Sequence, residues 1–394
     1  MPTLKDSSSL TPHYLAVFVA VLGFSLVAPF FPHYVMDLGA SYTMLGFIVS
    51  VYGAVQLLTQ IPIGRLSDQM GRKKIMLLGL ATFSVLPLLY IYAKSADALI
   101  FIRALGGLGA SAVWPIAMAL IIDQAKAENR GAAMGRYNAA FFSALALGPL
   151  IGGMLYDHLG LNAPFYLWAI LGAASFLLVY FRINEPEKIS VMMGALASRG
   201  NEKLIAPGYH LTFLACSSVV LWAGVVGGFN FTMLPSYAAG LGFNATDVGI
   251  IYLVYGGSTA LFNIYFGRQA DRGAKKRLIF AGCLLGALSF AALSLANAMI
   301  TVTLLFAGLG MGLGMANPAA AALIADTTSA SRRGEVYGIF NTARMSGVVI
   351  GPLIAGLTAD LHGVEGSVRA FTLLAIAITI VTLSVRESNK AKYK

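Results

Sequence analysis

Twelve segments of mainly apolar residues follow one another along this chain, and each is about as long as a membrane-spanning helix. A spanning helix needs about 20 such residues, because the hydrocarbon core of a bilayer is about 30 Å thick. The alternative, a closed barrel, has a ten-residue alternating pattern that this sequence lacks. We therefore predict an all-α membrane protein with spans near residues 12–36, 43–66, 75–93, 98–122, 134–156, 162–181, 209–238, 247–266, 278–297, 299–325, 338–358 and 367–385.

The charge content supports this prediction. Only 11% of the 394 residues are charged, whereas a soluble domain carries about 25%. The first eleven residues are polar, and the apolar run that follows has no small-residue cleavage site, so we interpret it as a retained first span. The expected location is the cell membrane, with the lipid bilayer as the surrounding partner.

Basic residues indicate the orientation. If the chain crosses twelve times, both termini lie on one side, and 23 of the 27 Lys and Arg residues lie there too. Because basic loops are retained in the cytoplasm, we expect both termini to be cytoplasmic. The net charge of +10 then reports orientation and contact with anionic headgroups, and no nucleic-acid partner is expected.

The chain also contains an internal repeat with one gapless offset of 203 residues, which relates Asp68 to Asp271 and Asp123 to Asp326. The repeat predicts two six-helix halves in parallel topology, an arrangement that permits alternating access around a site between the halves. The predicted domains are an N-terminal six-helix bundle at 1–182, a cytoplasmic linker at 183–208 and a C-terminal six-helix bundle at 209–394.

Each half carries one charged turn, at residues 64–76 and 267–279. Glycines suit the tight backbone of a short loop, and the basic residues keep the loop in the cytoplasm. Asp68 lies where a helix N-terminus would favour a carboxylate, and Arg72 could reach Asp123 at the end of the fourth span. The alternative is a topology anchor with no switching role. The candidate gating residues are Gly64, Asp68, Gly71, Arg72, Asp123, Asp271, Lys275 and Asp326.

Four motifs resemble those of the major facilitator superfamily, and more narrowly of its twelve-helix drug/proton antiporter branch. They are Gly64-x3-Asp68-x2-Gly71-Arg72-Lys73, Leu22-Gly23-x5-Pro29-x2-Pro32, Arg103-x2-Gly106-Gly107-x-Gly109-Ala110 and Gly148-Pro149-x2-Gly152-Gly153. The sequence departs from the family pattern at Ala144, Ala274 and Lys275, and a second glycine–proline motif occurs at Gly351-Pro352. The helix-motif candidates are Pro29, Pro32, Gly148, Pro149, Gly152 and Gly153.

The resemblance implies a secondary transporter in which the charged turns latch the cytoplasmic side while the protein opens outward. It also implies protons as the coupling partner. No Asp or Glu lies near the middle of a predicted span, so the proton-carrying residue is not evident from the sequence.

Two arginines fall within predicted spans, Arg103 and Arg344, and the repeat mirrors neither of them, since they align with Phe306 and Phe141. An ionisable residue inside a span usually faces a cavity or a partner; the alternative is snorkelling to an interface. The candidates for the substrate or proton pathway are Arg103, Arg344, His33, Asp37, Gln56, Trp114, Asn138, Asn230, Asn263 and Asn341.

We predict a proton-coupled efflux permease for lipophilic small molecules or drugs that works by rocking-bundle alternating access. The alternative is an importer or facilitator for a small organic anion bound by Arg103 and Arg344. An enzyme is not expected, because the sequence has no metal cluster, nucleophile elbow or phosphate loop. No cofactor or metal is predicted, and a monomer is expected.

Overall fold

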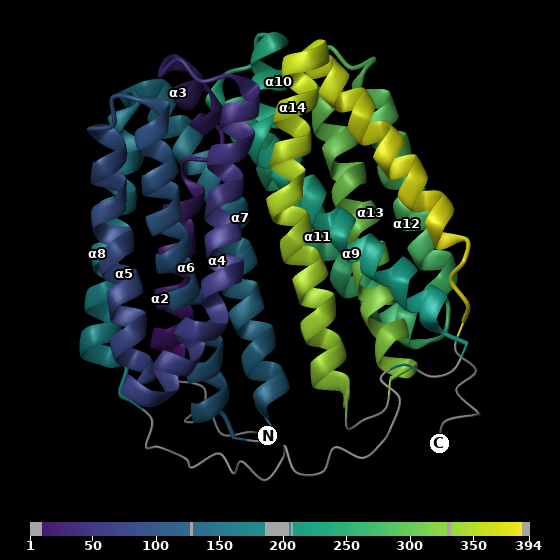
Figure 1. The fold of residues 1–394 in the computed structure, drawn as a ribbon, viewed down its shortest axis with the longest axis horizontal. Coiled ribbons are helices and arrows are strands. Elements are labelled where there is room, and N and C mark those ends of the chain that lie inside the picture. Colours follow the sequence, from purple (N-terminus) through teal and green to yellow (C-terminus); the bar gives the residue numbers. More distant parts are fainter. Residues whose placement is uncertain (1–9, 127–128, 186–204, 206–207, 329–331, 388–394) are drawn as a thin grey trace. The chain divides into compact units, whose positions relative to one another are not determined.

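The structure is a computed structural model, and it describes residues 10–126, 129–185, 205, 208–328 and 332–387. These residues form helices joined by short turns (Figure 1). Most of the predicted linker at 183–208 lies outside the described residues. The helices are α2 (Thr11–Ser25), α3 (Phe31–Asp37), α4 (Tyr42–Met70), α5 (Arg72–Ile91), α6 (Ala96–Gln124), α7 (Arg130–Leu159), α8 (Asn162–Arg182), α9 (His210–Thr232), α10 (Leu234–Gly240), α11 (Ala245–Asp271), α12 (Lys275–Leu293), α13 (Met299–Asp326) and α14 (Arg333–Thr382).

Within the described residues, ten helices are long and apolar enough to cross a membrane. The first predicted span is divided into α2 and α3, which are separated by a turn that contains Pro29. Proline lacks the N–H that continues a helix, and Pro32 lies in the first turn of α3, where that N–H is not needed. The last two predicted spans form α14, which bends at Gly363 (φ 76°). The prediction of an all-helical membrane protein is therefore confirmed.

The chain divides into two compact units. The first comprises residues 1–189 and 234–253, and the second comprises 190–233 and 254–394. The short segment 234–253 thus groups with the first unit although it follows the predicted linker, and the boundaries of the two six-helix bundles stay a prediction.

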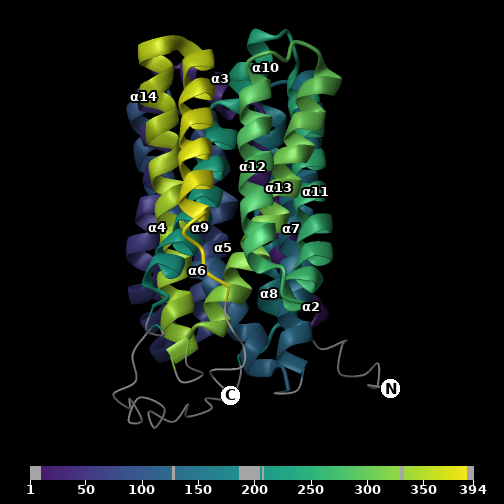
Figure 2. The same cartoon turned by 90° about the vertical axis from the view of Figure 1, so that its right-hand side faces the viewer.

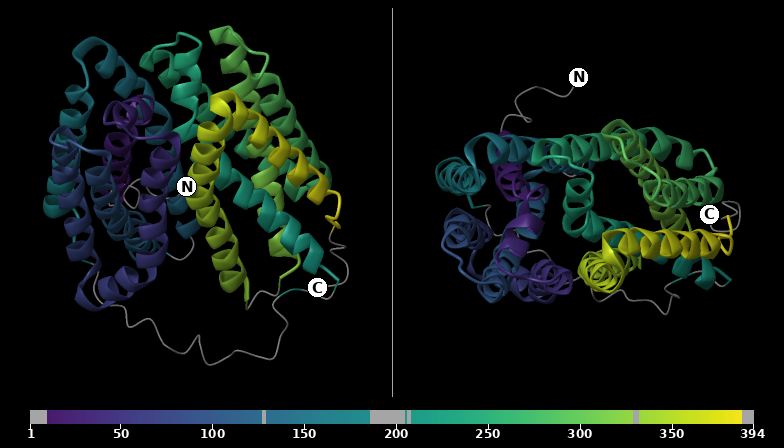
Figure 3. Two further views of the ribbon diagram at one scale, coloured as in Figure 1. Left: turned by 45° about the horizontal axis from the view of Figure 1, so that its top comes forward. Right: turned by 90° about the horizontal axis from the view of Figure 1, so that it is seen from above.

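In the first unit, helices pack through small residues and cross-helix hydrogen bonds. Helix α2 packs against α7 and α8, α4 against α6, and α5 against α6 and α8; seen from above, these helices form one bundle (Figure 3). A Cβ on Gly107 would lie 2.5 Å from the Tyr52 carbonyl oxygen, so only glycine permits this approach of α6 to α4. Ser175 donates a hydrogen bond to the Ala16 carbonyl at 2.9 Å, which joins α8 to α2. Small residues are the usual means of close helix packing in membranes.

In the second unit, α9 packs against α14, and α12 packs against α13 (Figure 2). The backbones of α12 and α13 touch at one point, where a Cβ on Gly312 would lie 2.5 Å from the Gly282 carbonyl oxygen. A Cβ on Gly282 would in turn lie 2.9 Å from the Ala316 nitrogen. One helical turn farther along α12, Gly286 has open space at its Cβ position, with no described atom within 4 Å.

These two glycines of α12 provide a matched test of the packing. We expect Gly282→Ala to destabilise the purified protein by about 1–3 kcal/mol, because its methyl group overpacks the α13 backbone. Gly286→Ala should leave stability unchanged or raise it slightly, because its methyl group enters open space and alanine favours helix. Thermal unfolding of both variants in the same detergent measures the difference. Equal melting temperatures would contradict the close contact of α12 with α13.

Candidate functional site

The charged turn of the first unit is a network of ion pairs around Arg72. Helix α4 ends at Met70, and Gly71 adopts φ 107°, a conformation that favours glycine. The Arg72 guanidinium then lies 2.8 Å from Asp123 Oδ2 and 3.3 Å from Asp68 Oδ1. The predicted contact of Arg72 with Asp123 is therefore present. No described atom lies within 4 Å of a Cβ placed on Gly64, so the structure shows no close helix approach there.

A further acid, Glu185, completes this turn and was not predicted from the sequence. Its two carboxylate oxygens accept hydrogen bonds from the backbone N–H groups of Arg72 (2.6 Å) and Lys73 (2.9 Å) at the start of α5. In return, the Lys73 ammonium donates to the Tyr180 carbonyl at 2.8 Å, near the end of α8. Negative charge is favoured at a helix N-terminus and positive charge at a C-terminus, so the ends of α5 and α8 stabilise each other.

The turn of the second unit repeats this plan with changes. Lys275 replaces arginine, is 5% exposed and forms an ion pair with Asp326. The positive φ lies one residue earlier than in the first turn, at Gly273 (φ 114°), which explains why the position that aligns with Gly71 can be Ala274. Glu387 accepts a hydrogen bond from the Lys276 N–H at 3.3 Å, as Glu185 does from Lys73.

The signal for these two acids was present in the sequence but weak. Glu185 and Glu387 each follow the last span of a half, and their spacing of 202 residues misses the repeat offset by one. An exact-offset comparison therefore does not pair them. Both cap a helix that begins right after a charged turn, which only the fold brings close.

The glycines of the Gly148-Pro149 motif set the contact of α7 with α2. Ser25 donates a hydrogen bond to the Ala144 carbonyl at 3.1 Å, and a Cβ on Gly148 would overlap the Ser25 hydroxyl. A Cβ on Gly152 would likewise lie 2.6 Å from the Leu26 carbonyl carbon. The motif glycines are thus required for packing within the first unit, and Pro149 is buried between them.

Arg103 lies in the interior of the first unit among aromatic rings. It is 2% exposed, and its guanidinium carbon lies 3.9 Å from the centroid of the Phe31 ring. The Tyr52 and Tyr90 rings follow at 5.9 Å each. Aromatic faces attract cations, so a cage of rings surrounds this charge. We call Arg103 with these three aromatic residues the arginine cage.

The other predicted pathway residues differ in exposure. In the first unit, Asn138 and Asp37 are exposed and His33, Gln56 and Trp114 are half-buried; in the second, Asn263, Asn341 and Arg344 are exposed and Asn230 is buried. Two of them touch, since the Arg344 guanidinium donates to the Asn341 amide oxygen at 3.3 Å. The assignment of these residues to a pathway stays a prediction.

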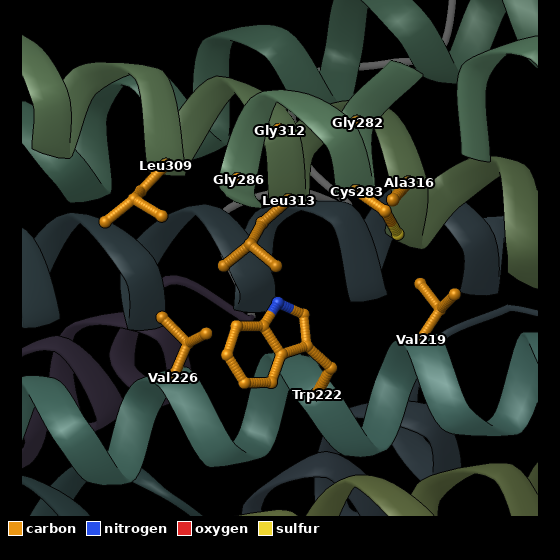
Figure 4. Close-up of a pocket in the computed structure, with 10 residues that line it drawn as sticks. All are labelled: Val219, Trp222, Val226, Gly282, Cys283, Gly286, Leu309, Gly312, Leu313 and Ala316. Carbon is orange, nitrogen blue, oxygen red and sulfur yellow. The ribbon is translucent and has the colours of Figure 1, made fainter. Parts of the chain in front are cut away.

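A small apolar cavity lies inside the second unit between α9, α12 and α13 (Figure 4). Its lining carries no charged side chain, and the indole of Trp222 projects into it. Such a lining suits an apolar group. The residues around it are Val219, Trp222, Val226, Gly282, Cys283, Gly286, Leu309, Gly312, Leu313 and Ala316.

Comparison with known proteins identifies the family. The family model described as Major Facilitator Superfamily matches residues 14–228 and 211–394, which is nearly the whole chain. This chain belongs to the major facilitator superfamily. Members of the superfamily are transporters of small molecules, so the chain is a multi-pass membrane transporter.

Individual relatives cover the chain from end to end. The quinolone resistance protein NorA of Staphylococcus aureus is 28% identical over 388 residues, which is 97% of each chain. An MFS-type transporter of Methanocaldococcus jannaschii is 26% identical over 377 residues, covering 94% of this chain and 96% of its own. A solved bacterial homologue of the human lysosomal transporter Spinster has 14% identity, full coverage of both chains and a TM-score of 0.81. This last likeness confirms the major facilitator fold.

The carboxylate of Glu185 provides a test of the turn. We expect Glu185→Ala to destabilise the protein by about 1 kcal/mol, because it removes the acceptor for two N–H groups at the start of α5. Glu185→Gln should reduce the stability by less, because the amide oxygen still accepts one of these hydrogen bonds. Thermal unfolding of the purified variants measures the effect, with Glu365→Ala as a control at an exposed pair of little energetic weight. An unchanged melting temperature for Glu185→Ala would contradict the capping role.

Proposed function

We propose that this transporter is a proton-coupled efflux permease for lipophilic small molecules in the cell membrane, with both termini in the cytoplasm. The observation that carries the proposal is the end-to-end similarity to a quinolone resistance protein at 28% identity. The chemistry of the chain agrees with it. The predicted pathway residues are mainly amides and aromatic rings, which suit a lipophilic solute with few hydrogen-bonding groups.

The surroundings of Arg103 in the arginine cage support a role for this residue in export rather than in binding an anionic substrate. An anion site needs a guanidinium that can present its N–H edge to a carboxylate. Arg103 is buried and its guanidinium lies against the Phe31 ring, inside the helix bundle of the first unit. A fixed positive charge in this position repels protons and other cations. We therefore assign Arg103 to the control of proton access.

The anion-transport alternative is supported by a different residue, Arg344. It lies eleven positions after the first residue of α14, or about 16 Å along the helix at 1.5 Å per residue. Its side chain is exposed and carries an amide neighbour, Asn341. A charge at such depth is unfavourable against hydrocarbon. We infer that Arg344 faces a water-filled region, and that an anionic substrate would be held there.

We further propose that the ion pairs of the charged turns latch the cytoplasmic side of the transporter. Arg72 lies between two acids from different helices, Asp68 of α4 and Asp123 of α6, so the position of one helix end depends on the other. In the second unit, Lys275 and Asp326 join α12 to the end of α13 in the same way.

The latch is tested by removing its charges singly. We expect Asp68→Asn and Arg72→Ala each to reduce dye efflux from cells by at least about tenfold while the amount of inserted protein is unchanged, because transport requires the turn to switch and folding does not. Efflux of a fluorescent lipophilic dye and quantitative immunoblotting of membranes measure the two quantities. The control is Arg65→Ala, which removes a basic residue of the same turn that forms no ion pair within the described residues. Full efflux by both latch variants would show that the turn only anchors the topology.

Arg103 separates the two functions. We expect Arg103→Ala to uncouple dye efflux from an imposed pH gradient in proteoliposomes and Arg103→Lys to retain part of the coupling, because a lysine keeps the positive charge under the rings. Uptake of organic anions is measured side by side, with Arg344→Ala as the comparison. Unchanged dye efflux in Arg103→Ala together with loss of anion uptake would overturn the efflux assignment in favour of anion transport.

A further inference from the structure

The end of α7 opposite the charged turn makes a polar contact with the beginning of α11. Asp157 lies in the last turn of α7, and its carboxylate accepts hydrogen bonds from the Ala245 N–H (3.3 Å), the Thr246 N–H (2.8 Å) and the Thr246 hydroxyl (2.6 Å). All of these residues belong to the first unit. The contact joins two helices that are almost 90 residues apart in sequence.

Asp157 supplies hydrogen-bond acceptors to the first backbone N–H groups of α11. The first N–H groups of a helix have no partner inside the helix. Asn244 and Asp247 satisfy one another through a local capping box, in which each side chain accepts from the backbone N–H of the other, at 2.9 and 3.1 Å. The N–H groups of Ala245 and Thr246 remain, and both are taken by Asp157. Within the described residues, the N-terminus of α11 therefore obtains two of its hydrogen-bond acceptors from α7.

The two backbones are in contact beside this carboxylate. A Cβ on Gly153 of α7 would overlap the Ala245 carbonyl and lie 2.8 Å from the Thr246 nitrogen. A Cβ on Gly249 of α11 would lie 2.6 Å from the Leu150 Cα. Glycines on both helices thus allow the two backbones to approach each other closely.

The other face of α7 differs. Its motif glycines Gly148 and Gly152 are buried against α2. Asp157 is exposed, so water can replace each of its hydrogen bonds if the two helix ends separate. One face of α7 therefore contacts α2 through Gly148 and Gly152, and the other contacts α11 through Gly153 and Asp157.

We propose that Asp157 is a positioning residue that clasps the N-terminus of α11 to the end of α7, and that this clasp opens and closes in each transport cycle. The third glycine of the motif, Gly153, belongs to the clasp, whereas Gly148 and Gly152 belong to the packing of α7 on α2. The proposal rests on membership of a transporter superfamily and is independent of whether the substrate is a drug or an anion.

The test measures the separation of the two helix ends directly. Spin labels are placed at Leu159→Cys and Leu241→Cys in a background with Cys216→Ala and Cys283→Ala, and the distance distribution is recorded by double electron–electron resonance in nanodiscs. Both labelled positions belong to the first unit. Neither substrate nor a pH gradient is present, so the result does not depend on whether the protein exports lipophilic molecules. A negative result here would likewise leave the proposed efflux function untouched.

We expect Asp157→Ala to raise the ratio of the long-distance to the short-distance population by about tenfold, because it removes hydrogen bonds to a charged acceptor. Asp157→Asn should give a smaller increase, because its amide oxygen keeps one acceptor. Gly153→Leu should give an increase like that of Asp157→Ala while the carboxylate is intact, because its side chain forces the backbones apart. His158→Ala, at the exposed neighbouring position, should leave the distribution unchanged.

Two outcomes would overturn the proposal. One is an unchanged distance distribution in both Asp157→Ala and Gly153→Leu, which would show that the contact does not influence the separation of the two helix ends. The other is an equal shift in His158→Ala, which would show a general response to substitution at this end of α7. If Asp157→Ala fails to give monodisperse protein, the distance distribution of Asp157→Asn is compared with that of the parent protein. An unchanged distribution in Asp157→Asn would then contradict the clasp.

Discussion

Contact between backbones at glycine is the constraint on which both units depend. In a membrane, hydrophobic burial does not drive helices together, so packing relies on close approach. Gly107 brings α6 onto α4, Gly148 brings α7 onto α2, and Gly282 with Gly312 brings α12 onto α13. At each point a single methyl group would meet a neighbouring atom at less than normal contact distance. These contacts set how closely the paired helices approach each other.

Charged residues act at the ends of this glycine-packed framework. At one end, Arg72 and Lys275 pair with acids at the ends of α6 and α13, and Glu185 and Glu387 cap the helices that follow the turns. At the other end of α7, Asp157 caps α11. In all of these cases a carboxylate or a cation from one helix satisfies the terminus or the charge of another. All of these interactions are polar. The Arg72–Asp123 and Lys275–Asp326 ion pairs are partly buried, whereas Glu185, Glu387 and Asp157 are exposed.

Part of the candidate site was predictable because it is local in sequence. A tight, glycine-containing first turn and the pairing of Arg72 with Asp123 follow from a motif of ten residues and a helix end. Arg103 was singled out as an ionisable residue inside a span, but its cage of Phe31, Tyr52 and Tyr90 comes from three other helices and has no sequence pattern. Glu185 and Asp157 were missed as contact residues for the same reason, since their partners are backbone N–H groups about 110 and 90 residues away.

The sequence by itself determined that this protein is helical, lies in a membrane and consists of two repeated halves, because apolar length, charge content and a fixed offset are properties of the chain alone. Tertiary structure decided which acid meets which helix end, and where the positive φ of the second turn falls, at Gly273. It also decided that the glycines of one motif face two different helices, Gly148 towards α2 and Gly153 towards α11. The physical reason is that backbone donors and carbonyls are the same at every position, so sequence carries no mark of which of them a distant side chain will contact until the helices are packed.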